Sequence, residues 1–493
     1  MFVVKLSAKI ICRKITLGNQ MDKSSYLKKI SAWDADAARH VLSRSLYGYS
    51  RTDIEFALSK SLDDFIDNYL LKDLPEPTPP TYNGAEWVTL ANNSTNSPNY
   101  SNYRYSLIWW WEDLMLQQGY SLREKMVWFY ANHFVTEYNT VQVPQYYYLS
   151  NKLFRQFAFG NLIELTKKVT IDPAMLKYLN GDVSTRTAPN ENYGRELMEL
   201  FTLGIGNYSE EDIKQAAKAL TGWRINSTTL SAYFTSSRWD SGTKTIFGKA
   251  GNWNADDVVD IIFSEKAVAA SEYLCRKLYK EFAYYEPNVD YVKQLAEVMR
   301  ANNFNLKPVL STMLKSQYFH SVDIRGAKIK SPIEFLVSLI RFFNLTYDND
   351  LLNQIRTKSR ELEQEILNPP DVRGWEGQRK WMNTTVYPTR NKFTDSLVTG
   401  IKINNKTYKI DVLTFSRSFP SAIPPSENAV QFIEEVTQVL IQFPLSQARK
   451  DFLLASLLDG TAVQNWSTYA TGASTRLEKF FKALMRLPEF QLS

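Results

Sequence analysis

Residues 188–204 read APNENYGRELMELFTLG, and this stretch has the pattern of an amphipathic helix. At about 100° per residue, its polar side chains fill an arc of about 140°. This arc contains Glu191, Asn192, Arg195, Glu196 and Glu199. The opposite side contains Tyr193, Leu197, Leu200 and Phe201. Pro189 suits the start of a helix and Gly204 suits the position just past its end, so the stretch predicts one helix bounded on both sides.

The same helical periodicity extends along most of the chain. It recurs over residues 34–71, 103–219, 255–317, 332–343 and 427–488. Residues 223–248 are instead rich in Thr, Ser, Tyr and Phe and predict short strands or loops. The stretch IKINNKTYKIDVL, residues 401–413, alternates around Asn404–Asn405 as a β-hairpin does. We therefore expect a mainly α fold, a large multi-helix domain with a minor β subregion and a hairpin.

The range of residues with helical periodicity predicts the domain organisation. We expect residues 31–493 to form a single large helical domain, after an unstructured extension over residues 1–30. The first twenty residues carry four basic residues, which interrupt every apolar run, so they lack a signal-peptide core. The sequence thus favours the cytoplasm over export but leaves the compartment open. The segments PEPTPPTYNG and NNSTNSPNYSN predict a Pro/Asn/Ser-rich surface loop at about residues 72–102.

The composition is that of a globular protein, because 44% of the 493 residues are apolar and 22% are charged. Aromatic residues are enriched at 14%, and their rings either pack in a core or stack on ligands such as sugars. The net charge of +6 is small and no basic run is present, so we expect no nucleic-acid partner. No apolar run reaches the length of a transmembrane segment, and Cys12 and Cys275 offer no disulfide framework.

One of the three histidines has a pattern that suggests a site. On the helix predicted over residues 122–135, His133 lies in the middle of an apolar stripe formed by Leu122, Met126, Phe129 and Tyr130. A buried imidazole needs hydrogen-bond partners, so His133 is either a satisfied core histidine or a catalytic base or metal ligand. His40 lies between Asp36 and Arg44 on a polar face, and we expect it to be solvated. His320 gives no pattern signal.

Two segments carry further candidate residues. On the 188–204 helix, Glu191, Arg195 and Glu199 are spaced for i,i+4 ion pairs on a solvent face. The alternative is that this polar face lines an internal cavity. Residues 368–383, NPPDVRGWEGQRKWMN, predict a tight loop that presents Asp371, Arg373 and Trp375. Such a loop either recognises a ligand or caps a core, and the sequence supports both interpretations equally.

In the catalytic interpretation, His133 is the general base, the glutamates are acids or ligands of a divalent cation, and Arg195 or Arg373 clamps an anion. The candidate catalytic residues are then His133, Glu191, Arg195, Glu196, Glu199 and Arg373. The candidate ligand-binding residues are Asn132, Asn190, Asn192, Asp371 and Trp375. A divalent cation is the one cofactor that these side chains suggest, and its identity stays open.

Several motifs are absent from the sequence. There is no GxSxG nucleophile elbow, no Walker-type phosphate loop, no dinucleotide-binding glycine fingerprint and no HExxH. No histidine follows a glutamate by three positions, so the signature of a di-iron helical bundle is missing. The sequence therefore predicts neither a nucleotide nor a flavin cofactor.

Seven stretches together resemble a bacterial family known as domain of unknown function 1800. They are AARHVLSRSLYGYS, LREKMVWFYANHFVTE, NLIELTKKVTIDPAMLKYLNGD, APNENYGRELMELFTLGIGNYSEEDIKQAAKALTGW, KIKSPIEFLVSLIR, PPDVRGWEGQRKWMNTT and LPEFQL. The resemblance extends from about Ala37 to Leu492. The family pattern often has His-Asn-His-Phe where this chain has Ala131-Asn132-His133-Phe134, so one histidine of that pair is missing.

The resemblance implies a large helical protein but no established activity, cofactor or catalytic residue. Relatives are often envelope-directed, and they are often encoded beside a sulfatase-like family, which implies a sulfatase-like partner protein. Two functional classes follow. The first is a binding or assembly component that works with a partner protein through its aromatic residues and loops. The alternative is a hydrolase that acts on a glycan or on a phosphate or sulfate ester, which requires His133, Glu196 and Arg373 to converge on one pocket.

Overall fold

Three largely buried helices lie at the centre of the fold. They are α2 (Ala35–Ser45), α6 (Arg123–His133) and α17 (Pro332–Phe342) in the computed structural model, which describes residues 21–493. Helix α17 begins with a capping box between Ser331 and Glu334 and has Pro332 in its first turn. Of its residues only Arg341 is not buried, so α17 is enclosed on all sides.

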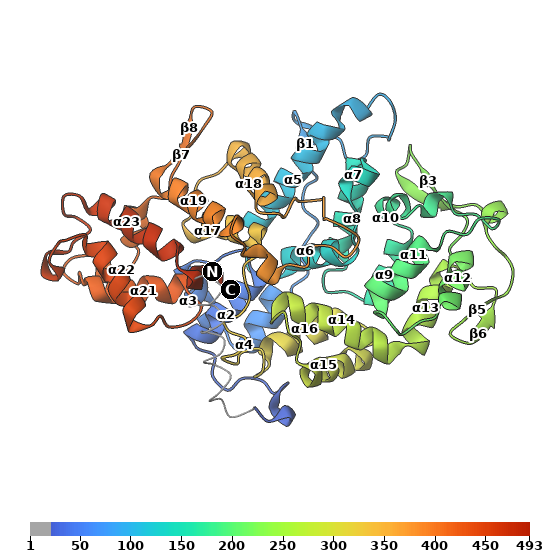
Figure 1. The fold of residues 1–493 in the computed structure, drawn as a ribbon, viewed down its shortest axis with the longest axis horizontal. Helices are drawn as coiled ribbons and strands as arrows, with labels where there is room; N and C mark the ends of the chain where they lie inside the picture. Colours follow the sequence, from blue (N-terminus) through green and yellow to red (C-terminus); the bar gives the residue numbers. More distant parts are fainter. Residues whose placement is uncertain (1–20) are drawn as a thin grey trace.

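The N-terminal and central helices surround these three (Figure 1). They are η1 (Lys23–Ser25), α3 (Arg51–Leu58), α4 (Leu62–Asp64), η2 (Phe65–Leu70), η3 (Ser97–Asn99), α5 (Tyr100–Leu116), α14 (Ala267–Phe282), α15 (Val289–Ala301), α16 (Leu306–Lys315) and α18 (Asn349–Glu361). The segments η2 and η5 are π-helical, and the other η segments are 3₁₀ turns.

A second group of helices lies at the right of Figure 1 and above the centre. It consists of α7 (Tyr138–Val141), α8 (Pro144–Gln156), α9 (Leu162–Thr170), α10 (Pro173–Tyr178), η4 (Gly181–Val183), α11 (Glu191–Glu196), η5 (Leu197–Thr202), α12 (Glu210–Ala219), η6 (Ser236–Arg238) and α13 (Ala255–Glu265).

The last group contains the C-terminal helices, of which α19, α21, α22 and α23 lie at the left of Figure 1. They are η7 (Gln378–Trp381), α19 (Val386–Thr399), α20 (Val412–Ser416), η8 (Pro420–Ala422), α21 (Ala429–Leu440), α22 (Gln447–Leu458), η9 (Val463–Asn465), α23 (Ala473–Met485) and η10 (Pro488–Gln491). This end is joined to the start of the chain, because the Arg39 side chain donates to the Gln438 carbonyl.

The β-structure is confined to four antiparallel hairpins in the described residues. They are β1 (Thr81–Tyr82) with β2 (Ala85–Glu86), β3 (Trp223–Asn226) with β4 (Ser231–Phe234), β5 (Lys244–Ile246) with β6 (Lys249–Gly251), and β7 (Ile401–Ile403) with β8 (Lys406–Tyr408). The expected mainly α fold is confirmed, and so are the β subregion at 223–248 and the hairpin around Asn404–Asn405.

One hydrophobic cluster extends through most of the chain, from Tyr26 to Phe490. A smaller cluster, which contains Trp87 and Tyr147, lies beside it. Within residues 21–493, no helix has both the length and the apolar character that a membrane crossing needs. These clusters explain the aromatic enrichment largely as core packing, because most of the rings are buried.

Two expectations about the first hundred residues need correction or refinement. The expected unstructured extension does not reach residue 30, because residues 23–25 form η1 and Lys29 pairs with Ser316 through a β-bridge. Its first twenty residues lie outside the described part of the chain. The stretch 72–102, expected to be a surface loop, contains the β1–β2 hairpin, and Trp87 within it is buried.

Candidate functional site

The helix predicted over residues 188–204 is present, but its geometry changes along its length. Asn190 caps α11, because its side-chain oxygen accepts a hydrogen bond from the Asn192 backbone N–H at 2.8 Å. The helix widens after Glu196 into the π-helix η5. Gly204 follows with a φ of +77°, as expected for the residue that ends a helix. Asn190 and Asn192 thus belong to the helix start.

The polar face of α11 is largely engaged in ion pairs. Arg195 makes a two-point contact with Glu210, at 2.7 and 2.8 Å, and a longer one of 3.5 Å with Glu191. The i,i+4 pair of Glu191 with Arg195 is therefore present. Glu199 does not pair with Arg195 but accepts a hydrogen bond from the Tyr208 hydroxyl. Burial first, and then the neighbouring Glu199, raise the pKa of Glu196.

His133 lies in the hydrophobic core and has no charged hydrogen-bond partner. Its Nε2 atom is 3.0 Å from the Phe201 carbonyl oxygen, to which it donates, and its buried Nδ1 atom has no hydrogen-bond partner among the described residues. The rings of Phe129, Phe134 and Phe201 surround the imidazole. Burial, and secondarily the charge of Lys277, lowers the pKa of His133 to about 3. The side chain is therefore neutral and has the surroundings of a core histidine.

The other two histidines are also buried, which corrects the expectation for His40. Its Nε2 atom donates to the Phe319 carbonyl at 2.9 Å, and the ring is 1% exposed. The helical wheel placed His40 on a polar face, but that face of α2 is covered by residues 319–324, whose Ile324 carbonyl accepts from Arg44. His320 likewise donates to a backbone carbonyl, that of Leu314.

The loop over residues 368–377 is held against the core by a side-chain amide. The Asn132 Oδ1 atom accepts from the Trp375 N–H at 2.7 Å, and its Nδ2 donates to the Trp375 carbonyl at 3.2 Å. The indole of Trp375 stacks on Trp128, with ring centroids 5.4 Å apart. The hollow beneath it has a volume of about 30 Å³, which is room for about one water molecule.

The charged residues of this loop lie outside the core. Asp371 and Arg373 pair with each other, and 63% of the Arg373 side chain is exposed. No hydrogen bond or ion pair joins Arg373 to His133 or to the glutamates of α11. Burial first, then the charges of Glu137, Asp371 and Glu196, raise the pKa of Tyr178 to about 12. Asp371 and Glu196 thus act electrostatically on the same phenol, whereas no direct polar contact joins His133 to Arg373 in residues 21–493.

A larger hollow lies in the C-terminal part of the molecule, between α19 and α23. This α19–α23 groove has a volume of about 520 Å³. Its lining consists of Tyr387, Pro388, Asn391, Lys392, Asp395, Ser396, Thr399, Lys482 and Arg486. Arg486 is paired with Asp395. Neither Lys392 nor Lys482 has an ion pair with any residue in the described part of the chain.

The sequence analysis did not find this groove. Its two walls are about ninety positions apart in the sequence, and the helices that form them carry no motif. The signal available in the sequence was weak: α23 has basic residues at intervals of three or four, at Arg476, Lys479, Lys482 and Arg486. A basic stripe of that kind does not reveal which helix packs beside it.

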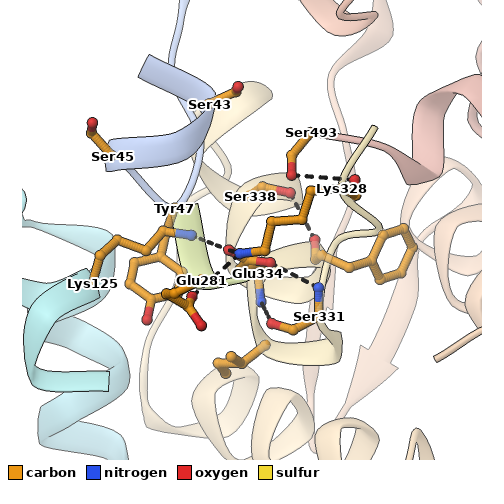
Figure 2. A network of polar contacts seen from close by, with 12 residues as sticks. Ser43, Ser45, Tyr47, Lys125, Glu281, Lys328, Ser331, Glu334, Ser338 and Ser493 are labelled. Carbon is orange, nitrogen blue, oxygen red and sulfur yellow. Dashed lines mark hydrogen bonds and ion pairs between the residues drawn. The ribbon is translucent and has the colours of Figure 1, made fainter. Parts of the chain in front are cut away.

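A buried ionic network, also missed, connects distant parts of the chain (Figure 2). Glu334 at the start of α17 pairs with Lys125 of α6 and, at 3.0 Å, with Lys328, which also reaches Glu281 of α14 at 3.3 Å. Burial opposes the charge on Glu334, but Lys125 and Lys328 outweigh it and hold its pKa far below the usual range. The second carboxylate oxygen of Glu334 accepts from the Ser331 backbone N–H at 2.8 Å.

This network is enclosed in protein and has the features of a structural element. Lys125 and Glu334 are both nearly fully buried, and the carboxylate is saturated by protein donors. In residues 21–493, no three His, Cys, Asp or Glu side chains are placed to hold a metal ion. The sequence clue was a capping box beside three lysines in otherwise apolar segments, Lys125, Lys328 and Lys330.

Comparison with known proteins adds one result. A family model described as "Protein of unknown function (DUF1800)" matches residues 40–492, which is nearly the whole chain. No curated protein matches the chain, and no solved structure does.

Proposed function

The chain belongs to the DUF1800 family, whose function is not established, and from that premise we propose that it is a binding component that holds a partner protein in the α19–α23 groove. One observation carries the proposal: a hollow of about 520 Å³ contains two lysines, Lys392 and Lys482, that have no ion-pair partner within residues 21–493. The groove is open to solvent rather than enclosed, and it has the room for a segment of another chain that the hollow beneath Trp375 lacks.

The chemistry of the groove specifies the kind of partner. Tyr387 and Pro388 give one wall an apolar surface. Lys392 and Lys482 contribute two cations, whereas the charge of Arg486 is already matched by Asp395. This lining fits a segment of a partner chain that carries an apolar side chain close to carboxylates. Exposed charges mainly steer and select a partner, so we expect a weak complex that salt disrupts.

A defined acidic peptide tests the proposal. The probe is a peptide of about nine residues with one leucine flanked by glutamates, titrated calorimetrically into the full chain at low salt. We expect saturable binding that weakens by about tenfold or more in the double variant Lys392→Glu/Lys482→Glu, because two attractive contacts become repulsive.

The matched control is Lys28→Glu/Lys293→Glu, which changes the net charge equally at two exposed lysines outside the groove. The control should keep the affinity of the unmodified chain to within about twofold. If the peptide does not bind the unmodified chain, or if both double variants lose affinity equally, the groove is not the binding site.

The hydrolytic alternative receives less support from the contacts of its residues. A general base must reach the proton that it abstracts, and the His133 imidazole is surrounded by phenylalanine rings and a backbone carbonyl. Arg195 is engaged by Glu210 and Arg373 by Asp371. The electrostatic effect of Asp371 and Glu196 on Tyr178 favours a polar site there, and its catalytic role stays a prediction.

A further inference from the structure

A loop at the opposite end of the molecule from the α19–α23 groove has a composition complementary to the lining of that groove. This 203–211 loop has the sequence LGIGNYSEE and consists of the connection between η5 and α12 together with the first two residues of α12. Ile205 is 80% exposed, which makes it the most exposed large apolar side chain in residues 21–493. Glu210 and Glu211 follow in the first turn of α12. An isolated apolar side chain next to carboxylates is the complement of an apolar wall next to lysines.

The backbone gives this loop a defined shape. Gly204 and Gly206 have φ values of +77° and +89°, which side chains other than glycine rarely adopt, and they place Ile205 at the tip. Below the tip, the Tyr273 hydroxyl donates to the Leu200 carbonyl at 2.8 Å. On the other side, Ser209 and Asp212 form a capping box that fixes the start of α12. A pre-shaped loop loses little entropy on docking.

The charge around the loop has the opposite sign to that of the groove. Residues 188–265, which contain α11, α12 and α13, include eleven acidic and seven basic residues. Residues 386–493, which contain both walls of the groove, include twelve basic and nine acidic residues. Glu210 is paired with Arg195, whereas Glu211 accepts a hydrogen bond from the Gln215 amide and has no ion pair in the part of the chain that the structure describes.

The two surfaces cannot meet within one molecule. In Figure 1, α11 and α12 lie at one end of the longest axis, and α19 and α23 lie at the other end, with the helices of the centre between them. Any contact between the 203–211 loop and the groove therefore joins two copies. Because the two surfaces are different, the contact is head-to-tail, and it can repeat without closing unless its rotation forms a ring.

This inference rests on the proposed function of the groove: we propose that the partner is a second copy of this chain. The 203–211 loop of that copy inserts Ile205 along the Tyr387–Pro388 wall. Its Glu211 then lies beside Lys392 and Lys482. A loop of nine residues covers less surface than a standard stable interface, so the association is weak and depends on concentration. It is also salt-sensitive, because exposed charges are largely screened beyond about 8 Å at physiological salt.

Sedimentation velocity on the full chain tests this assembly. We expect the weight-average sedimentation coefficient to rise with protein concentration at low salt and to fall back to the monomer value at about 0.5 M salt. Two variants should each stay monomeric: Lys392→Glu/Lys482→Glu, in which both ends are acidic, and Ile205→Lys/Glu211→Lys, in which both ends are basic. An equimolar mixture of the two variants should associate again, because the unmodified loop of the first variant then meets the unmodified groove of the second, and the reversed groove meets the reversed loop.

The outcomes separate the two proposals. If the acidic peptide binds the groove but the unmodified chain stays monomeric at every concentration and salt level, the self-association is wrong and the groove has another partner. If the chain associates but the mixture of variants does not, the contact lies elsewhere and this inference is wrong. If neither the peptide nor a second copy binds, both proposals fail. Circular dichroism of each variant shows whether it is folded.

Discussion

The side-chain amide of Asn132 pairs with both backbone groups of Trp375, 243 positions further along the chain. A side chain here makes the two hydrogen bonds that a neighbouring strand would otherwise make. The contact requires a glycine at position 374, since a Cβ there would lie 2.3 Å from the Asn132 Oδ1 atom. Through these hydrogen bonds, Asn132 and Trp375, both candidate ligand-binding residues in the sequence analysis, hold the loop over residues 368–377 onto the core.

Replacing Asn132 with alanine should therefore weaken the fold and release the loop. Loss of the two hydrogen bonds should lower the free energy of unfolding by about 1–3 kcal/mol in urea titrations. Amide hydrogen exchange over residues 368–377 should become faster at the same time. Asn192→Ala is the control, because that side chain is exposed and we expect a change within about 0.5 kcal/mol. Equal effects of the two substitutions would contradict this account of the clamp.

Gly374→Ala should be costly for two reasons that can be separated. Its φ of +80° strains any residue with a Cβ, and that Cβ would collide with Asn132. We expect a loss of about 1–3 kcal/mol in the free energy of unfolding. The loss should be smaller in an Asn132→Ala background, since the closest clash is with the amide side chain. A double-mutant cycle measures this coupling, and a coupling near zero would show that the two residues act independently.

The ionic network around Glu334 should be essential to folding. Glu334→Gln keeps the size of the side chain but leaves Lys125 buried without a negative partner in residues 21–493, and leaves Lys328 with Glu281 alone. We expect the free energy of unfolding to fall by about 3–5 kcal/mol, as measured by chemical denaturation. Glu361→Gln, which breaks an exposed pair with Lys358, should cost no more than about 1 kcal/mol. A small effect of the first substitution would mean that the network contributes little.

The buried histidine makes stability depend on pH in a predictable direction. The pKa of His133 falls from 6.5 to about 3 on folding, because burial disfavours the charged ring. The unfolded chain therefore binds more protons between these values, so stability is complete above pH 6.5 and is lost as pH falls toward 3. From pH 7 to pH 5 the chain should lose about 2 kcal/mol more than the variant His133→Phe, which cannot be protonated. Urea titrations at both pH values measure this difference, and identical losses would place His133 in contact with water.

Periodicity was sufficient to predict local structure. The 188–204 helix, the hairpin at 401–413 and the burial of His133 all follow from patterns in which the residues concerned are near one another in sequence. His40 was placed wrongly for the same reason. A helical wheel separates polar from apolar faces, but it does not show that a distant segment, such as residues 319–324, covers a polar face.

The candidate site could be predicted only in part, because it depends on contacts between residues that are far apart in the sequence. The sequence selected Asn132 and Trp375 without indicating that they pair, and it grouped Arg373 with His133 although Arg373 projects from an exposed loop. The α19–α23 groove has only a weak sequence signal, the basic stripe of α23, since its lysines become significant only when two helices pack side by side and leave their charges unmatched. Contacts of this kind, between residues far apart in the sequence, are the hardest to predict from a single sequence.

The most direct test of the binding groove is to identify which lysines the acidic peptide contacts. A carbodiimide joins a carboxylate to an amine only when the two are in contact, and mass spectrometry locates the bond. The account predicts that the leucine–glutamate peptide is attached chiefly at Lys392 and Lys482, and that about 0.5 M salt abolishes the attachment. Attachment spread over exposed lysines such as Lys28 and Lys293, in proportion to their exposure, would contradict it.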